Sequence, residues 1–430
     1  MRAYHWLFFI AAACGGNDAG PRIIPGGGVG DGAIDGTLHV GVIDTRSYSP
    51  ISGATVEVGS KMATTNDKGL ASFSDLSGAQ TITVKAANYR SAIWVDANGA
   101  NVTVPLTQLH EMPPQATLTG TITGYDAITV PTGHVKIAAV FESQTDDLGD
   151  PANNLTTPNS GNICLTQTMC NWTLASRTGT VTLIAAIMDQ DTKGTPTDTS
   201  DDTRTVIGYA IKTGVVVAAS VNQSGLALTS VEAGNLETVT VDYGTPPAAL
   251  TTTGAIVGIE VSKDEVVQLP LAVQIPATTT TMVVPKPTVF AADATRRLTA
   301  IAQTSSGDKG AQSIVVRHAL TSTTLAAGTW LDTPTGVMAT RTSVAYDPVA
   351  GAKAHSADFV DSNGDTQLEI TVFSTKAKTV DIPSLVALPS SGALTVKVNG
   401  IAADFDVTDF SLDTDRDKLT AIAAQPVTVN

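Results

Sequence analysis

Hydrophobic and polar residues alternate in short runs along most of this chain. Between residues 36 and 109 the alternation is clear at 37–44, 54–58 and 81–84, and polar turns containing glycine, such as 66–69, separate the runs. Successive side chains of a strand point to opposite faces, so such a run predicts a strand with one buried face. Frequent glycine and Asn/Asp turns between these runs are typical of antiparallel sandwiches.

The same pattern continues to the C-terminus. Further alternating or apolar runs lie at 116–122, 135–141, 179–188, 206–211, 236–241, 255–261, 313–317, 367–373 and 394–398. Helical periodicity is scarce, and the stretch 291–302 is the best candidate for a helix. Paired prolines at 113–114 and 246–247 interrupt strand pairing and mark boundaries. We therefore expect a mainly β protein with two or three tandem antiparallel β-sandwich domains. After a linker at 110–115, a second β domain would occupy 116–245 and a C-terminal β-rich domain 246–430.

The first residues predict an export signal. An apolar run from Trp6 to Ala13 follows Met1 and Arg2, and it is too short to span a bilayer, which needs about 20 residues. Its length is that of the apolar region of a signal peptide, which would comprise residues 1–13. The glycine-rich stretch 15–35 has almost no large apolar residue, so it is expected to be a flexible tether.

The residues around Cys14 resemble a known sequence motif. Ala11, Ala12 and Ala13 precede Cys14, and two glycines follow it. This segment resembles a bacterial lipobox, although Ala11 stands where Leu is usual. The resemblance implies cleavage before Cys14, diacylation of Cys14 and attachment to the lipid bilayer of the cell envelope, with outer-membrane or surface display. Two acyl chains anchor a protein stably in a bilayer, whereas a single acyl chain binds only weakly and reversibly. The alternative is an ordinary secretory signal that releases a soluble protein.

A second resemblance covers residues 36–109. The segments 50–58, 64–69, 73–76 and 82–89 follow one another in an order that is similar to the carboxypeptidase regulatory-like domain, a transthyretin-like sandwich. Asn88 replaces the usual glycine before Tyr89. The resemblance implies a folding and spacing module, because that family has no catalytic residues to transfer. Within it, Ala54, Val56 and Val58 share one face and are expected to pack into the core.

The net charge of the chain limits the classes of partner that it can bind. The formal net charge is −15 with no basic cluster, which argues against a nucleic-acid partner.

Cys164 and Cys170 lie close together in the sequence. With Cys14 set aside as the lipidated residue, they are expected to form the disulfide of a protein in an oxidising compartment. The alternatives are free thiols or half of a metal site. Trp172 is expected in the core, although beside a pinned loop it could also serve as a binding tip.

Acidic residues offer one candidate metal site. Asp189 and Asp191 follow the apolar run 183–188, and the next acidic residues are Asp198, Asp201 and Asp202. Calcium takes six to eight oxygen ligands from such loops, so calcium is the candidate ion, set against a solvated turn with no metal. The acidic stretches 361–365 and 413–417 are interpreted as turns.

No catalytic motif is present. The histidines stand singly, and the sequence has no zinc pair, nucleophile elbow or phosphate-binding glycine loop. We therefore expect a non-catalytic envelope lipoprotein that binds an extracellular protein or carbohydrate, adheres, or acts as a scaffold. The alternatives are a calcium-stabilised carbohydrate-binding protein and a secreted hydrolase whose catalytic groups meet only in space.

Overall fold

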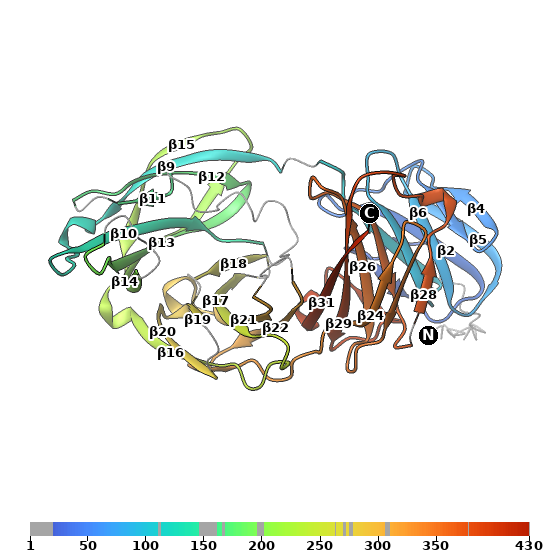
Figure 1. Ribbon diagram of the computed structural model, residues 1–430. Coiled ribbons are helices and arrows are strands. Elements are labelled where there is room, and N and C mark those ends of the chain that lie inside the picture. Colours follow the sequence, from blue (N-terminus) through green and yellow to red (C-terminus); the bar gives the residue numbers. More distant parts are fainter. Residues whose placement is uncertain are drawn as a thin grey trace, which may run out of the picture. The chain divides into compact units, whose positions relative to one another are not determined.

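The computed structural model describes residues 20–429, except 111–112, 146–160, 166–167, 196–201, 263, 270–271, 275–277, 306–309 and 377. Strands dominate these residues, as the alternating pattern predicted, so the fold is mainly β with several sheets (Figure 1). The described residues contain no α-helix and hence no helix that could cross a membrane. Their short 3-10 turns are η1 (Tyr125–Ala127), η3 (Ala233–Asn235), η4 (Pro287–Val289), η6 (Ser384–Val386) and η7 (Arg416–Lys418).

The chain divides into two compact units. Unit 1 contains residues up to 107 together with 406–416, and unit 2 contains 108–405 and the residues from 417 onward. The boundary between residues 107 and 108 falls close to the linker expected at 110–115. The return of 406–416 to unit 1 was not expected from the sequence, so the units are not a simple tandem.

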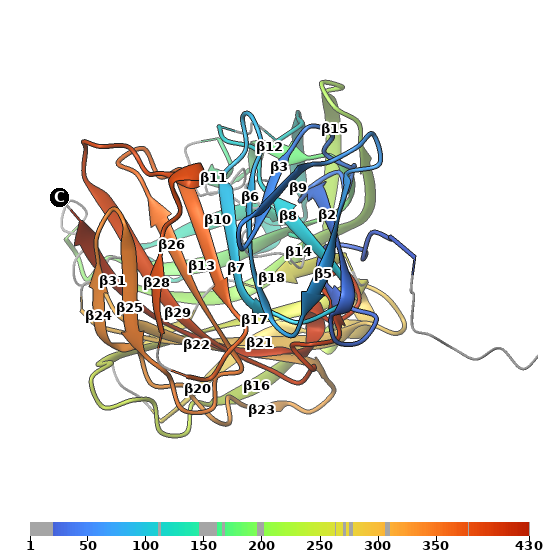
Figure 2. The same ribbon diagram turned by 90° about the vertical axis from the view of Figure 1, so that its right-hand side faces the viewer.

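Unit 1 is built from two groups of strands, drawn mostly in blue in Figure 2. One sheet has the order β30 (Phe410–Ser411), β1 (Gly28–Gly30), β8 (Asn101–Leu106), β2 (Asp35–Asp44) and β5 (Leu70–Ser77). The other strands have the order β7 (Ser91–Ala97), β6 (Gln80–Lys85), β3 (Thr55–Val58) and β4 (Lys61–Thr64). Ala54, Val56 and Val58 are fully buried, which confirms the face predicted for that run.

Residues 20–35 of unit 1 are not a flexible tether, and that prediction is wrong for this part of the segment. β1 pairs with β8 on one side and with β30 on the other. Ile24, Val29 and Ile34 are buried. Glycine is required where the backbone of β1 approaches that of β30, because a Cβ on Gly28 would lie 2.0 Å from the carbonyl oxygen of Phe410.

The side chain of Asn101 holds the start of this segment. Its Oδ1 accepts from the backbone N–H of Arg22 (3.0 Å), and its Nδ2 donates to the carbonyl oxygen of Gly20 (3.3 Å) and to Asp31 Oδ2 (2.9 Å). The Arg22 guanidinium donates to both oxygens of Asp31 at 2.5 and 2.9 Å. That contact holds the pKa of Asp31 below its usual range. We call residues 20–34 the strap.

Unit 2 contains a seven-stranded sheet and a larger sheet. The seven-stranded sheet has the order β11 (Ile163–Cys164), β10 (His134–Glu142), β13 (Gly179–Asp191), β14 (Thr203–Val217), β15 (Gln223–Ser230), β9 (Gln115–Thr123) and β12 (Asn171–Arg177). The larger sheet has the order β18 (Glu265–Gln268), β17 (Thr252–Ser262), β21 (Thr295–Gln303), β22 (Gln312–Leu320), β31 (Leu419–Val429), β29 (Leu394–Ala403), β26 (Ala354–Val360) and β27 (Thr366–Val372), and β19 (Ala272–Gln274) also pairs with β17.

Two small sheets complete unit 2. Their orders are β20 (Thr279–Pro285), β16 (Leu236–Asp242) and β23 (Thr324–Ala326), and β24 (Thr335–Ala339), β25 (Ser343–Asp347) and β28 (Lys378–Asp381). Most pairs throughout the chain are antiparallel, but β2–β8, β15–β9 and β16–β23 are parallel. The helix considered for 291–302 is not formed. β21 lies there instead, paired on both edges by β17 and β22.

One hydrophobic core crosses the boundary expected at residue 246. It contains Tyr209 and Val239 from before that position and Val257 and Ala300 from after it. Residues 116–245 and 246–405 therefore lie in one compact unit, because the outer face of the seven-stranded sheet and the larger sheet bury apolar side chains against each other.

Releasing the strap should be measurable by proteolysis. Asn101 is fully buried, so Asn101→Ala removes its hydrogen bonds to Gly20, Arg22 and Asp31, and each lost bond costs about 1 kcal/mol. We expect faster tryptic cleavage after Arg22 in Asn101→Ala than in the wild type, at a temperature where both remain folded. An unchanged cleavage rate would show that the amide does not hold the strap.

Candidate functional site

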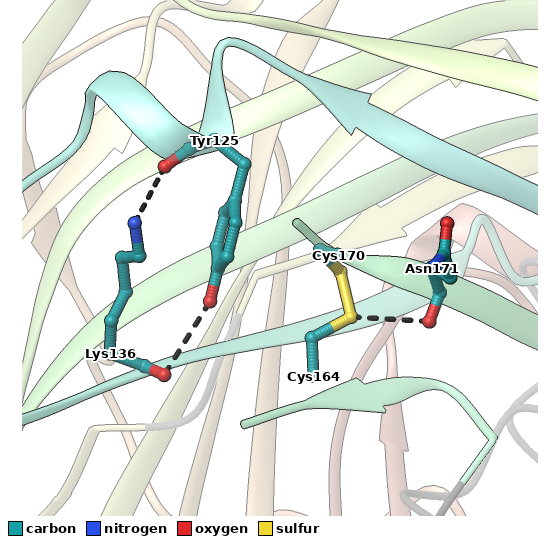
Figure 3. The surroundings of a disulfide bond; sticks show 5 residues. All are labelled: Tyr125, Lys136, Cys164, Cys170 and Asn171. Atoms are coloured by element: carbon teal, nitrogen blue, oxygen red, sulfur yellow. Dashed lines mark hydrogen bonds between the residues drawn. A yellow bond between two sulfur atoms is a disulfide. The ribbon is translucent and has the colours of Figure 1, made fainter. Parts of the chain in front are cut away.

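The first and last strands of the seven-stranded sheet meet at a seam. The backbone N–H of Thr173, in β12, donates to the carbonyl oxygen of Gly161, just before β11 (2.7 Å). The Cys164–Cys170 disulfide bridges the same edges, with the two Cα atoms 5.4 Å apart (Figure 3). The sheet is therefore curled nearly into a barrel, and this closure protects two strand edges.

The predicted disulfide is present, and its environment is more buried than a surface loop requires. Cys164 and Cys170 are 5% and 0% exposed, within the same core as Trp172. Trp172 is 1% exposed, which confirms its expected place in the core and excludes its use as a binding tip in this conformation. Leu165 and Met169, between the cysteines in sequence, are exposed.

A buried lysine lies close to the disulfide (Figure 3). The ammonium of Lys136 donates to the carbonyl oxygens of Tyr125 and Ile128, both at 2.7 Å, and lies 4.2 Å from the centre of the Tyr125 ring. Burial lowers the pKa of Lys136 and raises the pKa of Tyr125 to about 12. These contacts satisfy a cation inside the sheet, so the arrangement is structural. The sequence signal was a lysine within the apolar run 135–141.

A second polar group closes the other end of the seam. The carboxyl group of Glu142, at the end of β10, accepts from the hydroxyl of Ser176 and from the backbone N–H of Arg177 (3.0 Å). The Arg177 Nε donates back to the carbonyl oxygen of Ser143 (3.0 Å). Burial raises the pKa of Glu142 to about 7, although these hydrogen bonds and the charge of Arg177 act to lower it.

The same group links the seven-stranded sheet to the larger one. The Ser143 hydroxyl donates to Oε1 of Glu265, in β18, at 2.8 Å, and it accepts from the backbone N–H of Thr182 (2.9 Å). Gln144 and Val266 exchange two backbone hydrogen bonds of 2.7 and 2.9 Å. None of these polar residues was singled out from the sequence, because their pairing depends on strands far apart in the chain.

Two of the acidic residues proposed for calcium, Asp189 and Asp191, contact the side chains of His134 and Lys193. Asp189 and Asp191 lie within β13 and not in a loop after it, so their side chains share one face of the sheet. Nδ1 of His134 lies 2.8 Å from Asp189 Oδ1, and its Nε2 lies 3.8 Å from Asp191 Oδ1. The Lys193 ammonium is 2.5 Å from Asp191 Oδ2, and this contact lowers the pKa of Asp191.

The remaining candidates do not complete a cation site in the described part of the chain. Asp202 Oδ2 accepts from the side chain of Gln190 (2.6 Å). Asp198 and Asp201 lie outside the described residues, as does Cys14. Among the residues that the structure describes, no three acidic, His or Cys side chains are grouped as metal ligands would be. The stretch 361–365 forms the expected hairpin turn, with Asp361 capping it.

Two further histidines bear on the hydrolase alternative. Nδ1 of His318 lies 2.6 Å from Glu260 Oε1. Burial acts to raise the pKa of Glu260, but hydrogen bonds from His318, Ala319 and Thr295 outweigh it and lower that pKa. Within the described segments no serine, threonine or cysteine side chain is hydrogen-bonded to His318. A serine–histidine pair in the described residues, His39–Ser72 at 2.8 Å, is an exposed cross-strand pair.

Comparisons with known proteins do not assign this chain to a family. The sequence matches no protein-family profile and no curated protein. Among solved structures, it is similar to the Bacillus anthracis TIE protein at 12% identity and TM-score 0.15, over 63% of this chain and 45% of that one. It is also similar to the shaft pilin SpaA from Lactobacillus rhamnosus GG at 13% identity and TM-score 0.14, over 46% of this chain and 98% of that one. Such low scores carry no argument about function.

Removing the disulfide should weaken unit 2. Closing a loop of this size stabilises the folded state by about 2 kcal/mol on the chain-entropy estimate. We expect Cys164→Ala/Cys170→Ala to unfold at lower denaturant concentration than the wild type. A reductant should shift the wild type toward the variant and leave the variant unchanged. Equal midpoints for oxidised wild type and variant would contradict a stabilising seam.

Glu142 should make stability fall as pH rises. Its folded pKa of about 7 lies above its ordinary value of 4.5, so the folded state keeps a proton that the unfolded state loses between these values. We expect the unfolding free energy of the wild type, measured relative to that of Glu142→Gln, to fall between pH 4.5 and 7. Above pH 7 the difference should level off. A difference that does not change with pH would contradict the protonated carboxyl.

Asp189 and Asp191 should stabilise the fold through their contacts with His134 and Lys193 and without calcium. Partly exposed contacts of this kind contribute up to about 1 kcal/mol each. We expect Asp189→Asn/Asp191→Asn to lower the melting temperature slightly, by the same amount with calcium or with chelator. A calcium-dependent rise in the wild type that this variant lacks would contradict this expectation and support the calcium hypothesis.

Proposed function

We propose that this chain is a non-catalytic cell-envelope lipoprotein. Cys14 carries the lipid anchor after removal of residues 1–13, and the β units serve in adhesion, ligand binding or scaffolding at the surface. Residues 36–109 would act as a regulatory-like spacing module. The ligand class we favour is an extracellular protein or carbohydrate, and the net charge of −15 argues against nucleic acid.

The observation that carries this proposal is the disulfide in the core of unit 2. Cys164 and Cys170 are buried and join strands at opposite ends of one sheet, so the bond belongs to the folded architecture. Structural disulfides persist in oxidising compartments and are rare in the cytosol of mesophiles. A chain that needs this bond is best explained as an exported one.

The polar groups of unit 2 support a non-catalytic role. Lys136 and Glu142 are buried and satisfied by neighbouring backbone and side-chain groups. His134 is engaged with Asp189. A catalytic base is usually aimed at an open cleft where substrate can reach it. In the described residues these groups instead hold strands together, which favours binding or scaffolding over hydrolysis.

Intact-mass analysis of protein extracted from the membranes of the source cells tests the proposal. We expect a polypeptide that begins at Cys14, carries added acyl mass and lacks two hydrogens because of the disulfide. The matched variant Cys14→Ser should leave the membrane fraction while keeping the Cys164–Cys170 bond. An untrimmed polypeptide in the cytosol with reduced thiols would overturn the proposal.

A further inference from the structure

The strap fixes where an anchored chain would leave unit 1. The backbone N–H groups of Arg22 and Ile24 donate to the side chains of Asn101 (3.0 Å) and Thr103 (2.8 Å), so the strap runs beside the start of β8. Asn101 and Thr103 are fully buried. Gly20 therefore lies at the end of unit 1 from which β8 begins.

The same end contains the start of β2. The backbone N–H of Ala100 donates to the carbonyl oxygen of Gly32 (2.8 Å), which places residues 32–33 beside the residue that precedes β8. Ser49 lies at the other end of β2, where its carbonyl oxygen accepts from the N–H of Asp44 (2.9 Å). In the pairing of β2 with β8, Asn101 lies opposite His39 and Leu106 opposite Asp44, so about 17 Å of strand separates the level of Asn101 from the Ser49 end.

The chain between the anchor and the strap is short. Six residue steps join Cys14 to Gly20, and a fully extended chain of that length reaches about 20 Å. A bilayer-embedded Cys14 therefore cannot leave unit 1 free to turn at a distance from the surface.

We propose that the anchored protein holds the Gly20 end of unit 1, which includes Asp31, Gly32 and Ala33, against the lipid headgroups, with the Ser49 end directed away. This orientation rests on the proposed lipidation of Cys14. The partner is the bilayer surface itself, and the cause is the short connection followed by a strap that is hydrogen-bonded to buried side chains. A flexible tether through residue 35 would give no such orientation.

Energy transfer from protein to membrane tests the orientation. Ala33→Cys and Ser49→Cys each place one free thiol at an exposed position, since the native cysteines are acylated or in the disulfide. Each full-length lipidated variant is labelled with a donor dye. It is then reconstituted into vesicles of phosphatidylethanolamine and phosphatidylglycerol that carry a rhodamine-labelled lipid. We expect higher transfer efficiency from position 33 than from position 49.

A longer connection provides the matched control. Inserting about 15 Gly and Ser residues between Gly16 and Asn17 raises the root-mean-square reach from about 13 to about 25 Å. We expect the insertion to lower transfer from position 33 and to remove the difference between the two positions.

The outcomes separate the orientation from the anchor. Acylated protein with equal transfer from both positions, or with higher transfer from position 49, would overturn the orientation and leave lipidation standing. Protein without acyl mass on Cys14 would overturn both.

Discussion

Closure of the seven-stranded sheet is the constraint on which the rest of unit 2 depends. A sheet that ends in β11 and β12 would otherwise present two strand edges, and each edge carries backbone groups that need partners. The disulfide closes the seam at one end and the Glu142–Arg177 group closes it at the other. With the seam closed, the interior side chains form one core, and the outer face is free to pack on the larger sheet.

The two closures differ in chemistry and therefore in what they require. The disulfide requires an oxidising environment while the protein folds. The polar closure requires that Glu142 and Arg177 be desolvated together, and Ser143 extends it to Glu265 on β18. Loss of either closure would expose strand edges, so we interpret this buried chemistry as structural.

Much of the fold could be predicted from the sequence because its cues are local. Alternation and glycine turns predicted the strands of residues 36–109, and the short spacing of Cys164 and Cys170 predicted their bond. The strap was missed because its glycines suggest flexibility until a neighbour is known. The buried ionisable residues Lys136 and Glu142 were missed because their partners come from other segments of the chain. At 291–302 the sequence contains helix formers, but pairing of β21 on both edges decided in favour of a strand.

Hydrogen exchange along the seam tests the closure most directly. The backbone N–H groups of Thr173 and Ile122 donate across or beside the junction, to Gly161 and Cys170. Reduction of the disulfide is predicted to accelerate exchange at β11, β12 and the end of β9, while β29 and β31 of the larger sheet stay protected. Unchanged protection at the seam after reduction, or equal loss of protection in both sheets, would contradict the account.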